Sequence, residues 1–206
     1  MSRENLPEYV AALLKPATYD HDVDSVELIQ THISFVTLAG NYVYKWKKPV
    51  NFGFLDFSTH ELRKLNCERE LTLNKRLCPD LYLEVVCITQ DEKGYAINGE
   101  GAVVEYGVKM RRMDQAGLMS RRVAEKVLDK SDLDRIVDVL VPFYAGARAD
   151  EEIQVFGTAE SVAVNVLENF EQTQGFIDDE VLPEPLFNKI RDYATAFLKH
   201  DEIFEK

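Results

Sequence analysis

A glycine and an asparagine between two strand-forming segments constrain the fold of this chain more than any other feature. The segment VELIQTHISFVTL (26–38) is rich in β-branched residues and has a polar centre, which predicts two short strands. Gly40 and Asn41 tolerate the positive φ angles of a two-residue hairpin turn, and the alternating segment YVYKWKK (42–48) follows them. We therefore expect an antiparallel meander of three strands in this part of the chain.

A loop and a helix are predicted to follow this meander. Pro49 cannot donate a backbone hydrogen bond to a sheet, so the third strand should end there. The next segment, VNFGFLDF (50–57), carries four large apolar side chains, and we expect it to form an apolar seam between the sheet and the following helix. Ser58 or Thr59 can cap that helix, which should run to about Cys78.

Two further strands and then a series of helices complete the pattern. LYLEVVCIT (81–89) and AVVEYGVKMRRM (102–113) have the composition of strands and are separated by a polar turn that contains glycines. Beyond this point the spacing of apolar residues is helical, with a capping box predicted at Ser131 and Asp134 and helices predicted over 159–173 and 185–199. The chain is therefore predicted to be α+β, with a mixed first half and a helical second half.

Charge and cysteine content exclude several classes of protein. The chain has 36 acidic and 24 basic residues and a formal net charge of -12, which argues against binding to nucleic acid or to an anionic membrane. The three cysteines form no CxxC pair, so neither a disulfide framework nor a zinc site is predicted, and we expect a cytoplasmic protein. Glu4 and Glu8 interrupt the N-terminal segment, so we expect a short amphipathic helix ending near Pro16 rather than a signal peptide or a membrane anchor.

A lysine and a glutamate are the strongest candidates for a functional pair. In the 42–48 strand, alternation places Val43, Lys45 and Lys47 on one face. On the following helix, at about 100° per residue, Glu70 lies beside a stripe of leucines, whereas Glu68 points nearly the opposite way. Phosphotransferases use a strand lysine held by an inward-facing helical glutamate to fix the α and β phosphates of ATP. An ordinary salt bridge between a strand and a helix is the alternative. The leucines of the stripe are Leu62, Leu65, Leu73 and Leu77.

Three segments of this region resemble the N-terminal domain of bacterial proteins in the aminoglycoside phosphotransferase-like family, a domain that is often fused to a P-loop kinase domain. They are THISFVTLAGNYVYKWKKPVNFGFLDFST (31–59), CERELTLNKRLCPDLYLEVV (67–86) and VEYGVKMRRM (104–113). The resemblance is strongest in KKPVNFGFLDFST and continues more weakly through the helices.

The resemblance implies a protein-kinase-like fold. Such a fold has an N-lobe with a five-stranded antiparallel sheet and one helix, then a hinge and a helical C-lobe. By this division residues 1–20 form a helical lead-in, residues 21–113 form the N-lobe and hinge, and residues 114–206 form a partial C-lobe.

The resemblance also implies roles for individual residues in binding ATP. By position, Lys45 matches the lysine that binds the phosphates, and Glu70 matches its helical partner. The segment VKMRRM matches the end of the fifth strand and the hinge, whose backbone would hydrogen-bond the adenine. Met110 and Met113 would pack near the base, with Val43 above it. Plain filling of the core is the alternative for each methionine.

The catalytic segment of such a kinase is absent from the sequence. A kinase of this type needs an HxDxxxxN loop, whose Asp acts on the acceptor hydroxyl and whose Asn binds magnesium, and then a second metal-binding Asp. None of the four histidines is followed two residues later by Asp, and there is no GxGxxG phosphate loop. The DFS segment at 56–58 precedes the helix of Glu70, so it is out of order for the second Asp. We expect no catalytic residues and no metal ligands in these 206 residues.

These observations predict the ATP-binding portion of a small-molecule kinase, shortened before its catalytic loop and inactive alone. Magnesium would bind only together with the missing C-terminal portion, and the sequence does not identify the acceptor substrate. The alternative is a non-catalytic interaction or regulatory module, which would self-associate through exposed helices of the C-lobe. Two charged clusters have simpler interpretations, as a solvated basic face (Lys109, Arg111, Arg112, Arg121 and Arg122) and as acidic helix caps (Asp150, Glu151 and Glu152).

Overall fold

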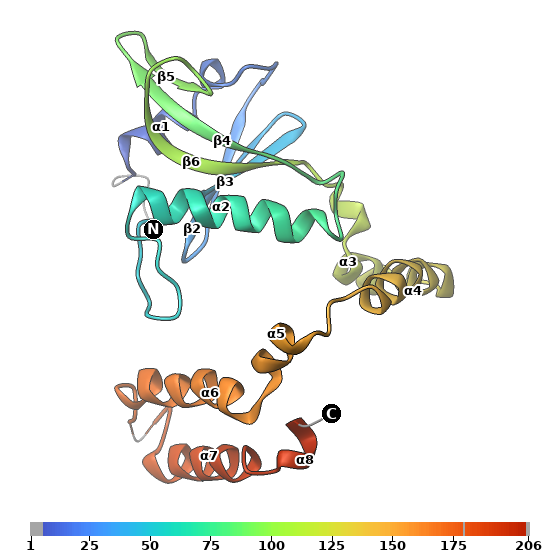
Figure 1. The fold of residues 1–206 in the computed structure, drawn as a ribbon. Helices are drawn as coiled ribbons and strands as arrows, with labels where there is room; N and C mark the ends of the chain where they lie inside the picture. Colours follow the sequence, from blue (N-terminus) through green and yellow to red (C-terminus); the bar gives the residue numbers. More distant parts are fainter. Residues whose placement is uncertain (1–5, 179, 205–206) are drawn as a thin grey trace. The chain divides into compact units, whose positions relative to one another are not determined.

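The chain divides into two compact units, the first ending at Val139 and the second beginning at Leu140. The computed structural model describes residues 6–178 and 180–204. The first unit contains a curled antiparallel sheet with helices, and the second is helical (Figure 1). The α+β class predicted from the sequence is therefore confirmed.

The sheet has six strands in the order β1-β2-β3-β6-β4-β5, and each neighbouring pair is antiparallel. The strands are β1 (Val26–Gln30), β2 (Ser34–Ala39), β3 (Tyr42–Lys47), β4 (Tyr82–Asp91), β5 (Gly94–Ile97) and β6 (Ala102–Arg111). The predicted meander of the first three strands is confirmed, and Gly40 has the positive φ, +56°, that its turn requires. β3 lies inside the sheet between β2 and β6, so its side chains are held from both sides.

The expectation of five strands is wrong, because the segment predicted as a polar turn contains β5. The carboxylate of Asp91 accepts hydrogen bonds from the backbone N–H groups of Lys93 (2.8 Å) and Gly94 (3.1 Å). This side-chain cap closes a tight hairpin, and residues Gly94–Ile97 then pair with β4. An aspartate cap of this kind gives no alternation of apolar residues, which is the pattern that predicts a strand.

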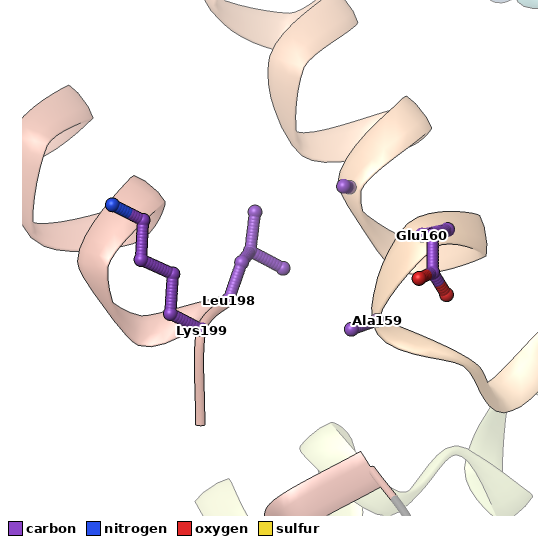
Figure 2. A pocket seen from close by; sticks show the side chains of 5 residues that line it. Ala159, Glu160, Leu198 and Lys199 are labelled. Atoms are coloured by element: carbon purple, nitrogen blue, oxygen red, sulfur yellow. The ribbon is translucent and has the colours of Figure 1, made fainter. Parts of the chain in front are cut away.

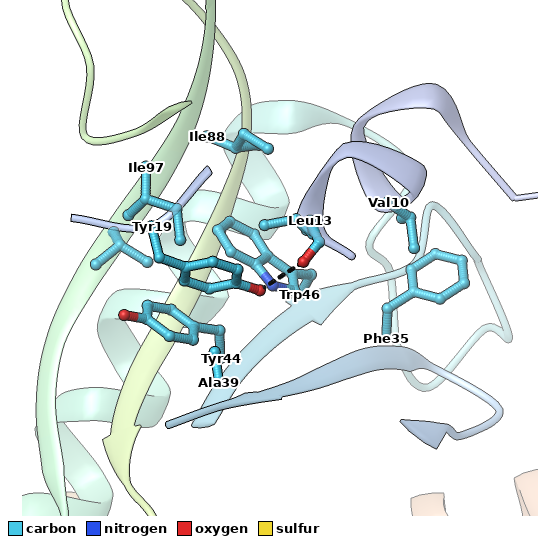
Figure 3. Packing of buried hydrophobic residues seen from close by; sticks show 10 residues of the cluster. Val10, Leu13, Tyr19, Phe35, Ala39, Tyr44, Trp46, Ile88 and Ile97 are labelled. Carbon is cyan, nitrogen blue, oxygen red and sulfur yellow. Dashed lines mark hydrogen bonds between the residues drawn. The ribbon is translucent and has the colours of Figure 1, made fainter. Parts of the chain in front are cut away.

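The main core of the sheet lies on the face that carries Tyr44 and Trp46, both fully buried. Val10 and Leu13 of α1 (Glu8–Leu13) pack into it, and the short 3-10 helix η2 (Pro16–Thr18) follows. Tyr19 donates a hydrogen bond from its hydroxyl to the carbonyl of Leu13 at 2.8 Å (Figure 3). The predicted short N-terminal helix is confirmed within the described residues, and it is part of the core of the sheet.

The helix α2 (His60–Lys75) packs against β4 and β6 (Figure 1). Thr59 is its cap, with the hydroxyl oxygen accepting a hydrogen bond from the N–H of Leu62 at 3.2 Å. The helix buries Arg63 and Cys67, whereas three leucines of the predicted inward stripe, Leu65, Leu73 and Leu77, are exposed. The stripe was therefore misplaced, and the inward side of α2 instead carries the buried Cys67 together with Arg63 and Glu70, which pair with charged side chains of the sheet.

The loop 50–57 is not the apolar seam that its composition predicts. Phe57 is buried, but Phe52 and Phe54 are exposed and their rings stack on each other at 6.3 Å between centroids. The loop closes on itself through an isolated bridge between Asn51 and Asp56. Local hydrogen bonds therefore hold the two phenylalanines in a turn of their own, away from the core.

The residues beyond Met113 are helical, as predicted. After the 3-10 helix η3 (Gln115–Gly117), the elements are α3 (Met119–Ala124), α4 (Lys130–Ala145), α5 (Glu151–Gln154), η4 (Val155–Gly157), α6 (Ala159–Gln174), α7 (Glu184–Phe197) and α8 (Asp201–Phe204). The capping box predicted at Ser131 is wrong, because Ser131 lies inside α4 and the carboxylate of Asp129 accepts the hydrogen bond from Asp132 N–H at 3.2 Å. Within the described ranges, each helix is too short or too polar to cross a lipid bilayer.

Candidate functional site

The predicted pairing of Lys45 with Glu70 is confirmed. Lys45 lies in the middle of β3, and its Nζ donates to Oε1 of Glu70 at 2.8 Å. Glu68, on the same helix, is half exposed and pairs with Lys64 at 3.9 Å instead. The side chain of Lys45 is 31% exposed, so its ammonium is held by the glutamate but still reaches solvent.

A second lysine binds the same glutamate, which was not predicted. Lys47 donates from Nζ to Oε2 of Glu70 at 2.7 Å, and its side chain is only 6% exposed. Its ammonium also lies 4.8 Å from the centre of the Phe57 ring. Strand alternation already placed Lys47 on the same face as Lys45, and a carboxylate has two oxygens, so the sequence did contain a signal for this contact.

The charges of this trio favour ionised Glu70. Burial alone would raise the pKa of Glu70, but hydrogen bonds and charges from Lys45 and Lys47 outweigh burial and lower the pKa below its ordinary value. With both lysines protonated, the trio carries two positive charges and one negative charge, so a single net positive charge remains. Lys45 is its exposed cation.

Apolar side chains flank Lys45 on the same face of the sheet. Val43 lies opposite Met110 in the pairing of β3 with β6, and Lys45 lies opposite the buried Val108. Cross-strand partners point to the same face, so these side chains form an apolar strip beside the lysine. Tyr82 lies opposite Met110 in the pairing of β4 with β6. The predicted residues Val43, Lys45 and Met110 are therefore neighbours.

Tyr82 is a further residue of this strip that the sequence did not single out. Partial burial raises the pKa of the Tyr82 phenol, as does the charge of Glu70, while Lys45 acts in the opposite direction. The phenol is therefore within electrostatic reach of the ion pair. Tyr82 begins β4, and its pairing with β6 opposite Met110 is what places it beside the ion pair.

Met113 differs from the other predicted residues, because it lies two residues beyond the end of β6. Its side chain is more than half exposed. Within the described part of the chain, the sheet register therefore places Met110, and not Met113, next to Val43.

A second buried ion pair anchors the start of α2. Arg63 donates from Nε to Oε2 of Glu105 at 2.8 Å, and both side chains are almost wholly buried. The same guanidinium donates to the carbonyl oxygens of Phe57 (2.8 Å) and Ser58 (3.1 Å). The pair fixes the helix to β6 and to the preceding loop, so its role is structural.

The two charged clusters have local partners. Lys109 lies 3.3 Å from Glu84, and Arg121 pairs with Glu125 at 2.7 Å. The other basic side chains contact Asp80 and Gly40 carbonyl oxygens (Arg111 and Arg112) and the Asp132 carboxylate (Arg122). In the acidic run, Asp150 caps α5, as the sequence indicated, and Arg148 pairs with both Asp150 and Glu152 at 2.7 Å.

The helical unit has a separate hollow of about 340 Å³ between α6 and the end of α7 (Figure 2). Ala159, Glu160 and Ala163 line one side, and Leu198 and Lys199 line the other. The hollow is open and its lining has a single acid and a single base. Across residues 6–178 and 180–204, no cluster of histidine, cysteine, aspartate or glutamate is arranged to hold a metal ion.

Comparison with known proteins finds relatives but no defined family. No family model matches the chain, and no solved structure matches it. The chain is 29% identical over 182 residues to uncharacterized proteins of Mycobacterium bovis and of two strains of Mycobacterium tuberculosis. The matched segment is 88% of this chain but 35% of each relative, so the chain spans about a third of the length of the curated relatives it matches.

Proposed function

We propose that this chain is the ATP-binding portion of a small-molecule kinase of the aminoglycoside phosphotransferase-like family, with a protein-kinase-like arrangement of its first unit. One observation carries the proposal: a partly exposed lysine on an interior strand, Lys45, is held by a helical glutamate, Glu70, at 2.8 Å. Kinases use such a pair to place a positive charge against the phosphates of a nucleotide.

The chemistry of Lys45 supports a phosphate ligand. An ammonium group has three N–H donors, and Glu70 accepts from it through one oxygen. The other donors are available to an anion, and the trio of Lys45, Glu70 and Lys47 keeps a net positive charge. Hydrogen bonds between a cation and a phosphate are stronger than those between neutral groups.

The apolar strip supports a base next to the phosphates. Val43, Met110 and Val108 lie on the same face of the sheet as Lys45, through the pairing of β3 with β6. In the proposed complex the adenine packs on Val43 and Met110, and the backbone beyond Arg112 supplies hydrogen bonds to its edge, because the N–H groups of Arg111 and Arg112 already donate to carbonyl oxygens of the chain at 2.8 Å. Met113 takes part only if the segment after β6 folds over the base.

We expect binding without phosphoryl transfer from these 206 residues. The sequence contains no HxDxxxxN motif, so the groups that orient the acceptor and bind magnesium would have to come from elsewhere in a longer protein. The acceptor is proposed to be a small molecule. The cysteines Cys67, Cys78 and Cys87 are free thiols, which fits the reducing cytoplasm in which we place the protein.

A second candidate is an interaction module that uses its helical unit, and one observation favours it. Several large apolar side chains of the second unit are mostly exposed, namely Phe156, Phe176, Val181 and Tyr193. If these side chains gather on one surface, that surface would suit association with another apolar face. On this proposal the chain self-associates or binds a protein partner and needs no nucleotide.

Calorimetric titration with ATP, with and without magnesium, separates the two candidates. We expect the wild-type chain to bind ATP, and the Lys45→Met variant to bind at least about tenfold more weakly, because a hydrogen bond to a charged group is lost. Lys64→Met is the matched control, since it removes the same charge from the exposed side of α2. Equal affinity of the wild-type chain and Lys45→Met would contradict the proposal, and concentration-dependent self-association without ATP binding would favour the interaction module.

A further inference from the structure

Lys47 is more deeply buried than Lys45, although both lysines bind Glu70. Its side chain is 6% exposed, and its ammonium is enclosed by Oε2 of Glu70 at 2.7 Å and the Phe57 ring at 4.8 Å. Lys45, two residues earlier on the same face, is 31% exposed and holds the other oxygen of Glu70. The two lysines therefore differ in accessibility although they share one carboxylate.

We propose that Lys47 is a positioning residue that holds the second oxygen of Glu70, so that the carboxylate is fixed and Lys45 is aimed at its anionic ligand. The ligand part of this inference rests on the proposed function. Lys47 itself does not contact the ligand, because its ammonium is enclosed.

Charge balance gives Lys47 a second effect on the ligand. Lys45 and Glu70 alone would form a neutral pair, whereas Lys47 adds a positive charge that leaves the trio with a net charge of about +1. A phosphate next to Lys45 would therefore meet a cation whose charge is not cancelled by Glu70. The ring of Phe57 stabilises the buried ammonium through a cation–π contact, which keeps this charge in place.

The hydrogen bond from Lys47 also restricts rotation of the Glu70 carboxylate. A carboxylate bonded through one oxygen can turn about its terminal torsion, and that torsion is broad in glutamate. A hydrogen bond at each oxygen removes this freedom, so the direction of the Lys45 hydrogen bond is fixed before ligand binds. Such preorganisation lowers the entropic cost of binding.

The first experiment compares ATP affinity among three variants. Lys47→Met keeps the apolar stem but removes the charge, and we expect about tenfold weaker binding than wild type although the residue is enclosed. Lys47→Arg keeps the charge and should recover most of the affinity. Lys48→Met is the matched control, because this neighbouring lysine contacts the Thr31 carbonyl oxygen (2.7 Å) rather than Glu70 and should bind ATP like wild type. Wild-type affinity in Lys47→Met would overturn the inference.

The second experiment needs no nucleotide and separates the two proposals. Carbon-13 NMR of labelled glutamate side chains should show Glu70 titrating at higher pH in Lys47→Met than in wild type, with the shift reduced in Lys47→Arg. An unchanged Glu70 titration would show that Lys47 does not hold the carboxylate. A wild-type chain that binds no ATP would refute the proposed function, while the Glu70 titration would still decide the role of Lys47.

A measurement on the wild-type chain covers the case in which Lys47→Met does not fold. The Nζ signals of Lys45 and Lys47 should both move at the pH at which Glu70 becomes protonated, since each lysine bonds one of its oxygens. A response of Lys45 alone would overturn the inference.

Discussion

The sheet region (residues 6–113) buries many of its large apolar side chains, whereas the helical region (residues 114–204) leaves most of them exposed. In the sheet, Tyr44, Trp46 and Ile88 are fully buried, and α1 covers this core. Among the described residues beyond Met119, Phe187 is the one apolar side chain that is almost wholly buried, and it packs edge-on against Phe170 at 5.6 Å between ring centroids. The sheet region therefore has a core of its own, whereas in the helical region a single almost wholly buried phenylalanine joins α7 to α6 among the described residues.

The difference indicates where a rigid binding site can be built. Lys45 and Glu70 belong to the region with the core, and β3 is held by β2 and β6 on its two sides. A site on such elements keeps its geometry, which charge recognition requires. The helical region has many exposed and few buried apolar side chains, so it gives less rigid support to a small-ligand site.

A matched pair of isoleucines gives the largest expected effect. Ile88→Ala empties a fully buried position of β4 and should lower the free energy of unfolding of the sheet by about 2–5 kcal/mol. Ile190→Ala acts on α7 at a position that is 48% exposed, and should change the stability of the helices by only about 0.5 kcal/mol. In denaturant titration Trp46 fluorescence follows the sheet, and the helical region is followed by the part of the circular dichroism change that does not coincide with the Trp46 transition, because α1 and α2 unfold with the sheet. An equal loss in the free energy of unfolding for the two variants would show that the sheet and the helical region do not differ in packing.

A glycine under the only tryptophan should give the next largest effect. A methyl group added at Gly107 would lie 2.6 Å from Cε3 of Trp46, which is closer than packed atoms approach. Gly107→Ala should therefore destabilise the sheet by about 1–3 kcal/mol, since the core must shift. Gly117→Ala is the control, because a methyl group there would meet no atom within 4 Å. If the two variants melted at the same temperature, the packing around Trp46 would be looser than described.

The acid stability of the sheet should depend on Glu70 to a smaller extent. The lysines lower the pKa of folded Glu70, so its ionised form stabilises the fold fully above its ordinary unfolded pKa of about 4.3. This contribution is lost as the pH falls through the lower folded value. Urea unfolding followed by Trp46 fluorescence, at pH values from about 3 to about 6, measures this contribution to the free energy of unfolding. Glu70→Gln should weaken the fold and remove this part of the pH dependence, while Glu68→Gln should retain the wild-type dependence.

The sequence was sufficient for the parts of the fold that local chemistry decides. The Gly40–Asn41 turn, the alternation in β3 and the cap of α2 depend on near neighbours, and each was predictable. β5 was missed because a side-chain cap by Asp91 makes a short polar segment into a hairpin.

The candidate site was predicted through the right residue for a partly wrong reason. The leucine pattern of α2 predicts that Glu70 faces inward, but Leu65 and Leu73 are exposed, and Glu70 faces the sheet where it binds two lysines. The contact of Lys47 depends on how far α2 lies from β3, which is set by tertiary packing. Periodicity in a single sequence does not contain that distance.

The central claim is that a nucleotide binds on the Val43, Lys45 and Met110 face of the sheet, and methyl NMR of the wild-type chain tests it most directly. With carbon-13 label in the methionine methyl groups, ATP titration should move the Met110 signal, because this side chain lies beside the proposed base site. Met119, at the start of α3, is the internal reference and should not move. A change in the Met110 chemical shift that saturates with ATP would support the claim. An unchanged Met110 chemical shift, or a change at Met119 alone, would contradict it.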